Sequence, residues 1–393
     1  MRQMKKGIIY LVLLLMLLLT ACSNSANPAG TEANGESVVN IGYSGPLSGP
    51  AAYYGKNSLS GLEMAAEEIN ADGGFEVDGK KYTVNLVSLD DKYLPNETGS
   101  NAKRLKQEHH TPIVYVPHSG GILATQVFNT QDPFIIGAYT SEPAIVEQGN
   151  PLTVQIPPKY DGYIEPFSKY QMEHFGKKIA LLPTSTQYGK DWTKALVPVW
   201  EKLGGEVVYE SSIDFNKDTD FFTIVTNALK KNPDVLFVGG PSEPTALVMK
   251  QARELGFKGG FIVMDQAKMD EIEAVLGGPE ALEGAVGVLP LVNTDFPGTK
   301  TFIEKYNQEH KKNPGSEAGY HYLSLYIFVE AMKAAKSVDD PQKIMEHLQD
   351  GLENMPDAKK VYEIEKIGKD GSLEMPYRIA AVKDGKVVEI PVK

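Results

Sequence analysis

Cysteine is almost absent from this chain, because Cys22 is the only one among 393 residues. No disulfide can therefore form within the chain, and its stability must come from a hydrophobic core. Three chemical signatures are missing as well. The sequence has no zinc-binding motif, no glycine-rich phosphate loop ending in Lys-Ser or Lys-Thr, and no serine flanked as Gly-x-Ser-x-Gly. We therefore expect neither a metal nor a cofactor, and the missing nucleophile motif counts against a hydrolase.

Basic residues are scarce relative to acidic ones. The chain carries 39 Lys and Arg against 51 Asp and Glu, a formal net charge of −12. Loss of residues 1–21 would remove Arg2, Lys5 and Lys6 and bring that charge to −15. A body this acidic is expected to avoid nucleic acid and to be weakly repelled by anionic lipid. Any membrane contact would then need an anchor rather than the protein surface.

The N-terminus has the layout of a secretory signal. The three basic residues precede twelve apolar ones at positions 8–19, a run too short to span a bilayer comfortably. The segment ends in Leu19-Thr20-Ala21-Cys22, which resembles the lipobox of bacterial lipoproteins. That resemblance implies a diacylglycerol on the Cys22 sulfur and a mature protein that begins there. An ordinary cleaved signal followed by a stray cysteine is the alternative, and in both cases the protein leaves the cytoplasm.

The segment after the signal predicts a flexible tether. Residues 23–37 contain small and polar residues and no large apolar one, so they cannot bury enough surface to fold. Folded chain is expected from residue 38 onward. About 355 residues remain there, which is more than one compact core usually takes. Two domains are therefore expected.

Strand and helix patterns alternate along the folded part. Strands are predicted at residues 38–43, 82–89, 113–116 and 134–136, with helices that include 97–109 and 122–130. The rhythm then repeats, with strands at 178–182, 206–209, 235–238 and 261–264. Three late helices are predicted at 299–311, 319–336 and 342–348, and a closing hairpin at 377–382 and 387–392. This alternation predicts an α/β fold of two doubly wound parallel sheets, with a cleft at the carboxyl ends of the strands.

A series of short motifs runs in order along nearly all of the folded part. It includes Ile41-Gly42-Tyr43-Ser44-Gly45-Pro46-Leu47-Ser48-Gly49-Pro50, Tyr54-Gly55, Gly73-Gly74, Asp90-Asp91, Gln187-Tyr188-Gly189, Pro233-Asp234 and Gln251-Ala252-Arg253-Glu254-Leu255-Gly256. Taken together, these motifs are similar to those of the periplasmic leucine/isoleucine/valine-binding proteins, solute receptors of ATP-driven importers. The resemblance implies a two-lobed type I periplasmic-binding-protein fold with a three-stranded hinge.

The resemblance also implies a domain layout in which the chain crosses between the lobes three times. Residues 1–21 form the signal peptide and residues 22–37 the lipidated tether. Lobe 1 then comprises residues 38–156 and 289–375. Lobe 2 comprises residues 157–288 together with a C-terminal hairpin at 376–393.

One short segment between a predicted strand and a predicted helix is suited to bind a carboxylate. Pro117-His118-Ser119-Gly120-Gly121 leads from a strand into a helix, and the first amides of a helix carry partial positive charge without an internal partner. Composition alone favours a plain glycine-rich loop, and it is the family resemblance that favours the carboxylate site. In relatives, the serine that matches Ser119 donates its hydroxyl and amide to the ligand carboxylate.

Further contacts are implied only by the resemblance. The segment matching Ala138, Tyr139 and Thr140 supplies backbone groups and a hydroxyl to the ligand carboxylate and ammonium. From the second lobe, the counterparts of Tyr188 and Asp265 close over the ligand, and the acid pairs with the ammonium. The remaining contact is Tyr54, whose counterpart is the aromatic residue that lines the side-chain pocket.

Three departures from the family pattern leave the ligand open. Tyr139 replaces a small residue, so its ring is expected to reshape the pocket. Pro241 and Ser242 stand where relatives direct tyrosines at the ligand. The two half-cystines of the relatives match Tyr93 and His118, and we expect His118 to have a structural role.

Expectations for the ligand and the partners follow from these matches and departures. The favoured ligand is a branched-chain or other apolar amino acid. If Gln266 rather than Asp265 faced the ligand, an aromatic carboxylate or a neutral amide or urea-like solute would fit instead. A surface-anchored hydrolase on the same scaffold is the rival class. We expect a monomer that is not an enzyme, is held to the outer face of the cytoplasmic membrane by lipid on Cys22, and meets the permease subunits of an ABC importer.

Overall fold

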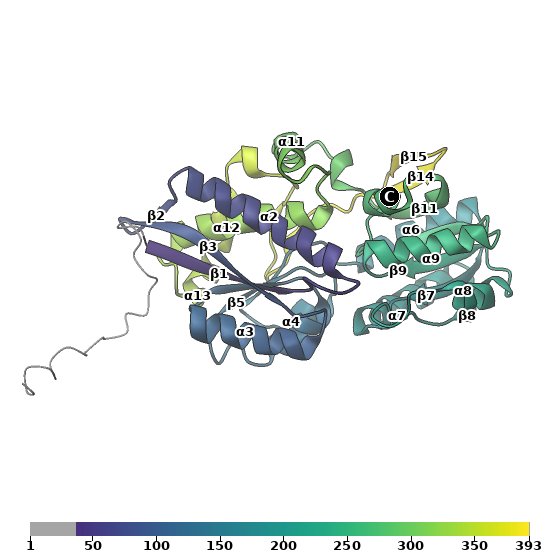
Figure 1. Ribbon diagram of the computed structural model, residues 1–393, viewed down its shortest axis with the longest axis horizontal. Coiled ribbons are helices and arrows are strands. Elements are labelled where there is room, and N and C mark those ends of the chain that lie inside the picture. The colour runs from purple at the N-terminus through teal and green to yellow at the C-terminus, as the bar shows by residue number, and fades with distance from the viewer. Residues whose placement is uncertain (1–36, 393) are drawn as a thin grey trace, which may run out of the picture.

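The computed structural model describes residues 37–392, which form two lobes, each built around a mainly parallel sheet (Figure 1). The sheet of the first lobe has the strand order β2-β3-β1-β4-β5-β6, and that of the second has the order β15-β14-β11-β10-β9-β7-β8. Helices cover both faces of each sheet, so a separate apolar layer lies on either side of the strands. The α/β fold with two lobes that the sequence predicted is confirmed.

The first lobe takes its strands from the early part of the chain and its helices from two distant parts. Its strands are β1 (Ser37–Gly45), β2 (Phe75–Val77), β3 (Lys80–Asp90), β4 (Ile113–Val116), β5 (Ile135–Ala138) and β6 (Thr153–Gln155). Its early helices are α2 (Ala52–Ala71), α3 (Pro95–His109), α4 (Ser119–Gln126) and α5 (Ala144–Glu147). The later helices are α11 (Thr299–His310), α12 (Ser316–Ala335), α13 (Pro341–Glu346) and α14 (Leu348–Asn354), with the short strands β12 (Lys366–Ile367) and β13 (Leu373–Glu374).

The second lobe is built mainly from the middle of the chain. Its strands are β7 (Lys178–Pro183), β8 (Glu206–Glu210), β9 (Val235–Gly239), β10 (Gly260–Val263) and β11 (Ala285–Val288), completed by β14 (Ile379–Lys383) and β15 (Lys386–Ile390). Its helices are α6 (Asp161–His174), α7 (Gln187–Lys202), α8 (Phe222–Leu229), α9 (Ser242–Glu254) and α10 (Met269–Leu276). The strands β7 to β11 pair in parallel, whereas β14 pairs antiparallel with both β11 and β15.

Three segments connect the two sheets. The chain leaves the first sheet after β6 and enters the second lobe at α6. It returns after β11 through a 3₁₀ turn at Leu291–Asn293, and it crosses for the third time between β13 and β14.

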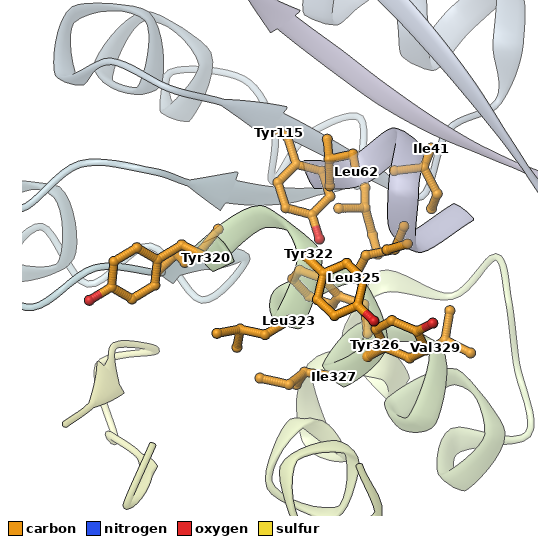
Figure 2. Packing of buried hydrophobic residues seen from close by; sticks show 14 of the residues in the cluster. Ile41, Leu62, Tyr115, Tyr320, Tyr322, Leu323, Leu325, Tyr326, Ile327 and Val329 are labelled. Carbon is orange, nitrogen blue, oxygen red and sulfur yellow. The ribbon is translucent and has the colours of Figure 1, made fainter. Parts of the chain in front are cut away.

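The core of the first lobe depends on α12, which is buried almost all round. This helix packs against α2 and presents aromatic and aliphatic side chains to the sheet (Figure 2). Gly61 of α2 makes that approach possible, because a Cβ atom there would lie 2.0 Å from the backbone oxygen of Ala318 in α12. A helix that is apolar on all sides is typical of the interior of a large domain.

Three predicted helices, at 122–130, 319–336 and 342–348, differ from those observed, and the second of them is α12, which begins at Ser316. The helix predicted at residues 122–130 is α4, which begins three residues earlier because the His118 ring accepts the Gly121 amide at 3.0 Å and caps the helix there. The helix predicted at 342–348 is split at His347 into α13 and α14. The sequence reading also missed α6, α10 and β11. The first correction matters most, because it places Ser119 at the start of a helix.

Candidate ligand-binding site

A small cavity lies between the two lobes at the carboxyl ends of their strands. The first lobe contributes residues that follow β4 and β5, and the second contributes the start of α7 and the residues after β10. The free volume is about 30 Å³, which is room for roughly two water molecules. A second cavity of about 30 Å³ adjoins it and is lined mostly by aromatic and apolar side chains. The lobes are thus closed on each other, and a ligand of amino-acid size requires them to separate.

The structure brings most of the predicted site residues together. The first cavity is lined by Tyr54, Ser119, Tyr139, Thr140, Tyr188 and Asp265. Ala138, the last residue of β5, is fully buried and does not line it. The cavity also has lining residues that the sequence reading did not assign to ligand binding, among them Ser141, Pro157 and Lys268.

The first-lobe wall is formed by the start of α4 and the end of β5. Ser119 is the first residue of α4, and its Oγ lies 2.7 Å from Thr140 Oγ1. The amides of Ser119 and Gly120 belong to the first turn, where the helix itself offers no acceptor. Two hydroxyl groups and these amides make this wall suitable for a carboxylate.

His118 supports that wall from behind. Its Nδ1 accepts the Gly121 amide, so Nε2 carries the proton and donates to Asp91 Oδ2 at 3.0 Å. Gly121 is required here, because a Cβ atom would lie 2.6 Å from the His118 ring. The Tyr93 and His118 rings are 4.7 Å apart, so the two residues that match the half-cystines of relatives pack together.

Asp265 forms the acidic part of the second-lobe wall. Its Oδ1 accepts hydrogen bonds from the Tyr188 hydroxyl and from Trp192 Nε1, the latter at 2.9 Å. Its Oδ2 hydrogen-bonds no group within residues 37–392. Burial, followed by the charge of Asp265, raises the pKa of Tyr188 well above its usual value, so this hydroxyl is a neutral donor. Asp265 therefore holds a fixed orientation with one oxygen free.

Gln266 lies beside Asp265 and also lines the first cavity. Its Nε2 donates to the Tyr93 hydroxyl of the other lobe at 2.7 Å. Its Oε1 is buried and has no hydrogen-bond partner among the described residues. Both alternatives that the sequence left open at this position are therefore at the cavity, and Gln266 in addition bridges the lobes.

Tyrosine rings fill the space between the two cavities. Tyr139 lines both, with its ring centroid 6.1 Å from that of Tyr54 and 4.8 Å from that of His321. Tyr54 is held in place because its hydroxyl donates to the backbone oxygen of Pro117 at 2.7 Å. Burial lowers the pKa of His321 to about 4, so the imidazole that packs against Tyr139 is neutral.

Polar contacts between the lobes surround the cavity. Ser141 Oγ lies 2.8 Å from the Tyr188 hydroxyl. On the other side, Asn57 of α2 donates to Glu271 of α10 at 2.9 Å and to Glu317 of α12 at 3.4 Å. Glu271 and Glu317 are both buried, and burial together with the charge of Glu317 raises the pKa of Glu271 well above its usual value. The closed form thus brings two carboxyl groups from different lobes together away from water.

Comparison with known proteins identifies the family of this chain. The family model described as periplasmic binding protein matches residues 38–386. The chain belongs to the periplasmic binding protein family. The family prediction made from the sequence is confirmed.

The relatives of this periplasmic binding protein match most of its length. It is 28% identical to an amino acid binding protein of Pseudomonas aeruginosa, over 81% of this chain and 84% of the relative. It is 23% identical to the Leu/Ile/Val-binding protein of Escherichia coli K12, over 79% of this chain and 82% of the relative. Among solved structures, the leucine-binding protein LivK of Thermotoga maritima aligns with a TM-score of 0.75 at 23% identity, covering 90% of this chain and 98% of the other.

Among residues 37–392, no helix combines the length and the apolar character that a membrane crossing requires. Within the same part of the chain, no group of three or more His, Cys, Asp or Glu side chains is arranged to hold a metal ion.

Proposed function

We propose that this periplasmic binding protein is the lipid-anchored solute receptor of an ABC importer and that it captures an amino acid by closure of its lobes. The proposal rests on the placement of hydrogen-bond donors on one wall of the cavity and of a carboxylate on the other. Ser119, Thr140 and the first amides of α4 stand on one lobe, and the free Oδ2 of Asp265 stands on the other. A carboxylate and an ammonium on one small ligand would bridge these two walls.

The relatives support the same class of ligand. The Escherichia coli relative is named for leucine, isoleucine and valine, and the Pseudomonas aeruginosa relative for amino acids. The aromatic surface of Tyr54 and Tyr139 suits the apolar part of a side chain. A branched-chain or other largely apolar amino acid is therefore the first ligand to test.

The contacts of Ser119 favour a receptor over a hydrolase. A serine nucleophile needs a base within hydrogen-bond reach. Ser119 Oγ pairs with Thr140, and both ring nitrogens of the adjacent His118 are engaged, one by the Gly121 amide and the other by Asp91. A turnover assay with esters and amides separates the two classes, and hydrolysis that Ser119→Ala abolishes would overturn the receptor proposal.

A thermal-shift screen of amino acids, aromatic acids and amides tests the ligand directly. A ligand present at 100 times its dissociation constant stabilises the folded state by about 2.7 kcal/mol. We expect the unfolding temperature to rise with at least one amino acid. A rise with benzoate or with urea-like amides alone would assign the receptor to another ligand class.

The anchor is tested at Cys22, which lies outside the described residues. Changing Cys22 to Ala is expected to abolish lipid labelling and to leave the precursor unprocessed or release it from the membrane, because the thiol is the attachment point in lipoproteins that share this motif. Metabolic labelling with a radioactive fatty acid measures this. Unchanged labelling in the variant would remove the case for a lipid anchor.

Closure itself is tested by small-angle X-ray scattering. Lobes joined by three segments are expected to move as rigid bodies, with the ligand favouring the closed form through contacts to both. The radius of gyration should fall when a ligand from the screen is added. A ligand that binds by calorimetry but leaves the scattering profile unchanged would contradict hinge closure.

A further inference from the structure

Lys268 is a buried cation in the wall of the cavity. It is the residue before α10, with 5% of its surface exposed, and it lines both cavities between the lobes. Its Nζ donates to the backbone oxygens of Asp265 and Gln266, the latter at 3.0 Å. Burying an ammonium group is costly unless its hydrogen bonds are satisfied, so its remaining bonding capacity is informative.

An ammonium group has three donors, and the two backbone oxygens account for two of them. None of the ion pairs within residues 37–392 includes Lys268, so no carboxylate of the described chain lies within 4.0 Å of its Nζ. Asp270 of α10 is close enough for the charge of Lys268 to act on its carboxyl, but it forms no ion pair with Lys268. One donor of Lys268 therefore remains for a group that enters the cavity.

Lys268 lies where the side chain of a bound amino acid would have to pass. When the carboxylate of such a ligand is held by the start of α4 and its ammonium by Asp265, the side chain must enter one of the two cavities. Both are lined by Lys268, together with Tyr139, Asp265 and Pro157. Whichever cavity the side chain takes, it passes this lysine.

We propose that Lys268 determines specificity and that the bound amino acid has a side chain ending in a carbonyl-type oxygen, a carboxylate or an amide. The inference rests on the proposed function and narrows it. An aliphatic side chain would leave the third donor of Lys268 buried without an acceptor. An oxygen at the end of the side chain would accept this third hydrogen bond. The methylene groups of the same side chain would pack against the Tyr139 ring. This ligand class departs from the aliphatic amino acids for which several relatives are named.

The test uses leucine, asparagine and aspartate, whose heavy-atom skeletons are the same, with glutamine and glutamate one carbon longer. Affinities are measured by calorimetry on the wild type, Lys268→Met, Lys268→Gln and Lys250→Met, where Lys250 is an exposed lysine of α9. We expect at least one oxygen-bearing ligand to bind the wild type about tenfold or more tightly than leucine. Lys268→Met should bring that ratio within threefold, Lys268→Gln should keep a preference for the amide but lose one for the carboxylate, and Lys250→Met should match the wild type.

Other outcomes separate this inference from the proposed function. Wild-type protein that binds leucine as tightly as the other ligands overturns the inference and leaves the receptor proposal standing. An equal loss of leucine and asparagine binding in Lys268→Met also overturns it, because Lys268 would then hold the ligand carboxylate. Absence of binding by all five amino acids would overturn the inference, whereas the proposed function is overturned only if no amino acid of the thermal-shift screen binds. Thermal unfolding of each variant without ligand shows whether the substitution causes a folding defect. If Lys268→Met is defective, the inference is tested with Lys268→Gln, which retains donors for the two backbone oxygens.

Discussion

Replacing Asp265 by Ala is expected to weaken amino-acid binding by about 2 to 5 kcal/mol. On closure the ammonium of the ligand leaves water, and a buried cation without a paired anion costs several kcal/mol. Asp265 is the acid available for that pairing, because Tyr188 and Trp192 engage only its Oδ1. Calorimetry with a ligand from the screen measures the loss.

The controls for Asp265 separate charge from structure. Asp265→Asn keeps an acceptor for Tyr188 and Trp192 but removes the charge, so it should lose most of the affinity while unfolding like the wild type. Ser119→Ala should cost less than Asp265→Ala, because the backbone amides of α4 remain for the carboxylate. An affinity within threefold of wild type for Asp265→Ala, or improved binding of a benzoate-like acid, would contradict the amino-acid ligand.

Closure is expected to take up protons, so ligand affinity should fall as pH rises from about 5 to 8. In the closed form the pKa of Glu271 is raised by burial and by Glu317, and burial with the same charge raises that of Asp270 to about 7. In the open form Glu271 leaves Glu317 and returns toward an ordinary value near about 4.3. A raised carboxyl pKa stabilises the closed form at low pH, and this stabilisation is lost above the open-form pKa. One linked proton changes affinity by up to about tenfold per pH unit, or about 1.4 kcal/mol.

Glu271→Gln is the variant that tests this linkage. It keeps the size of the side chain and a donor toward Glu317 but cannot ionise, so the affinity should depend less on pH and should rise at pH 8. Asp270 and Glu142, whose pKa values are both about 7, should leave a smaller residual dependence. Lys312, which donates to Asn57 at 2.6 Å, also faces the pair, and burial lowers the pKa of its ammonium. Tyr53 faces the pair as well, and burial raises the pKa of its hydroxyl to about 12, so it stays neutral. Glu273→Gln, a partly exposed position on the same helix, is the matched control, and equal pH profiles for the two variants would exclude the linkage.

The alternation of apolar segments was sufficient to predict the fold class, and one strand, β4 at Ile113–Val116, matches its prediction to the residue. Such strands are buried on both faces, which makes a continuous apolar run easy to recognise. The start of α4 was predicted wrongly because His118 caps it through a side-chain contact that no periodicity records. The order of motifs along the chain predicted the family. Residues from both lobes were assigned to one ligand site because of that resemblance.

Lys268 and the pair of Glu271 and Glu317 could not be predicted in the same way. Lys268 follows a parallel strand closely, which is a general signal for a cleft position, but its burial depends on loops from both lobes. Glu271 and Glu317 belong to different lobes and meet beside Asn57 of a third helix. Contacts that exist only in the closed arrangement leave no periodic pattern in the sequence.

The antiparallel insertion of β14 beside β11 has a consequence for how the protein is made. Val286 pairs with Ala381, and β15 pairs only with β14, so the sheet of the second lobe lacks its last two strands until the C-terminus is available. Contacts this distant in sequence slow folding, because a long loop must close before they form. The sheet of the second lobe is therefore expected to be completed only after the C-terminal strands have been synthesised. Loss of the last fifteen residues would leave β11 as a bare edge open to aggregation.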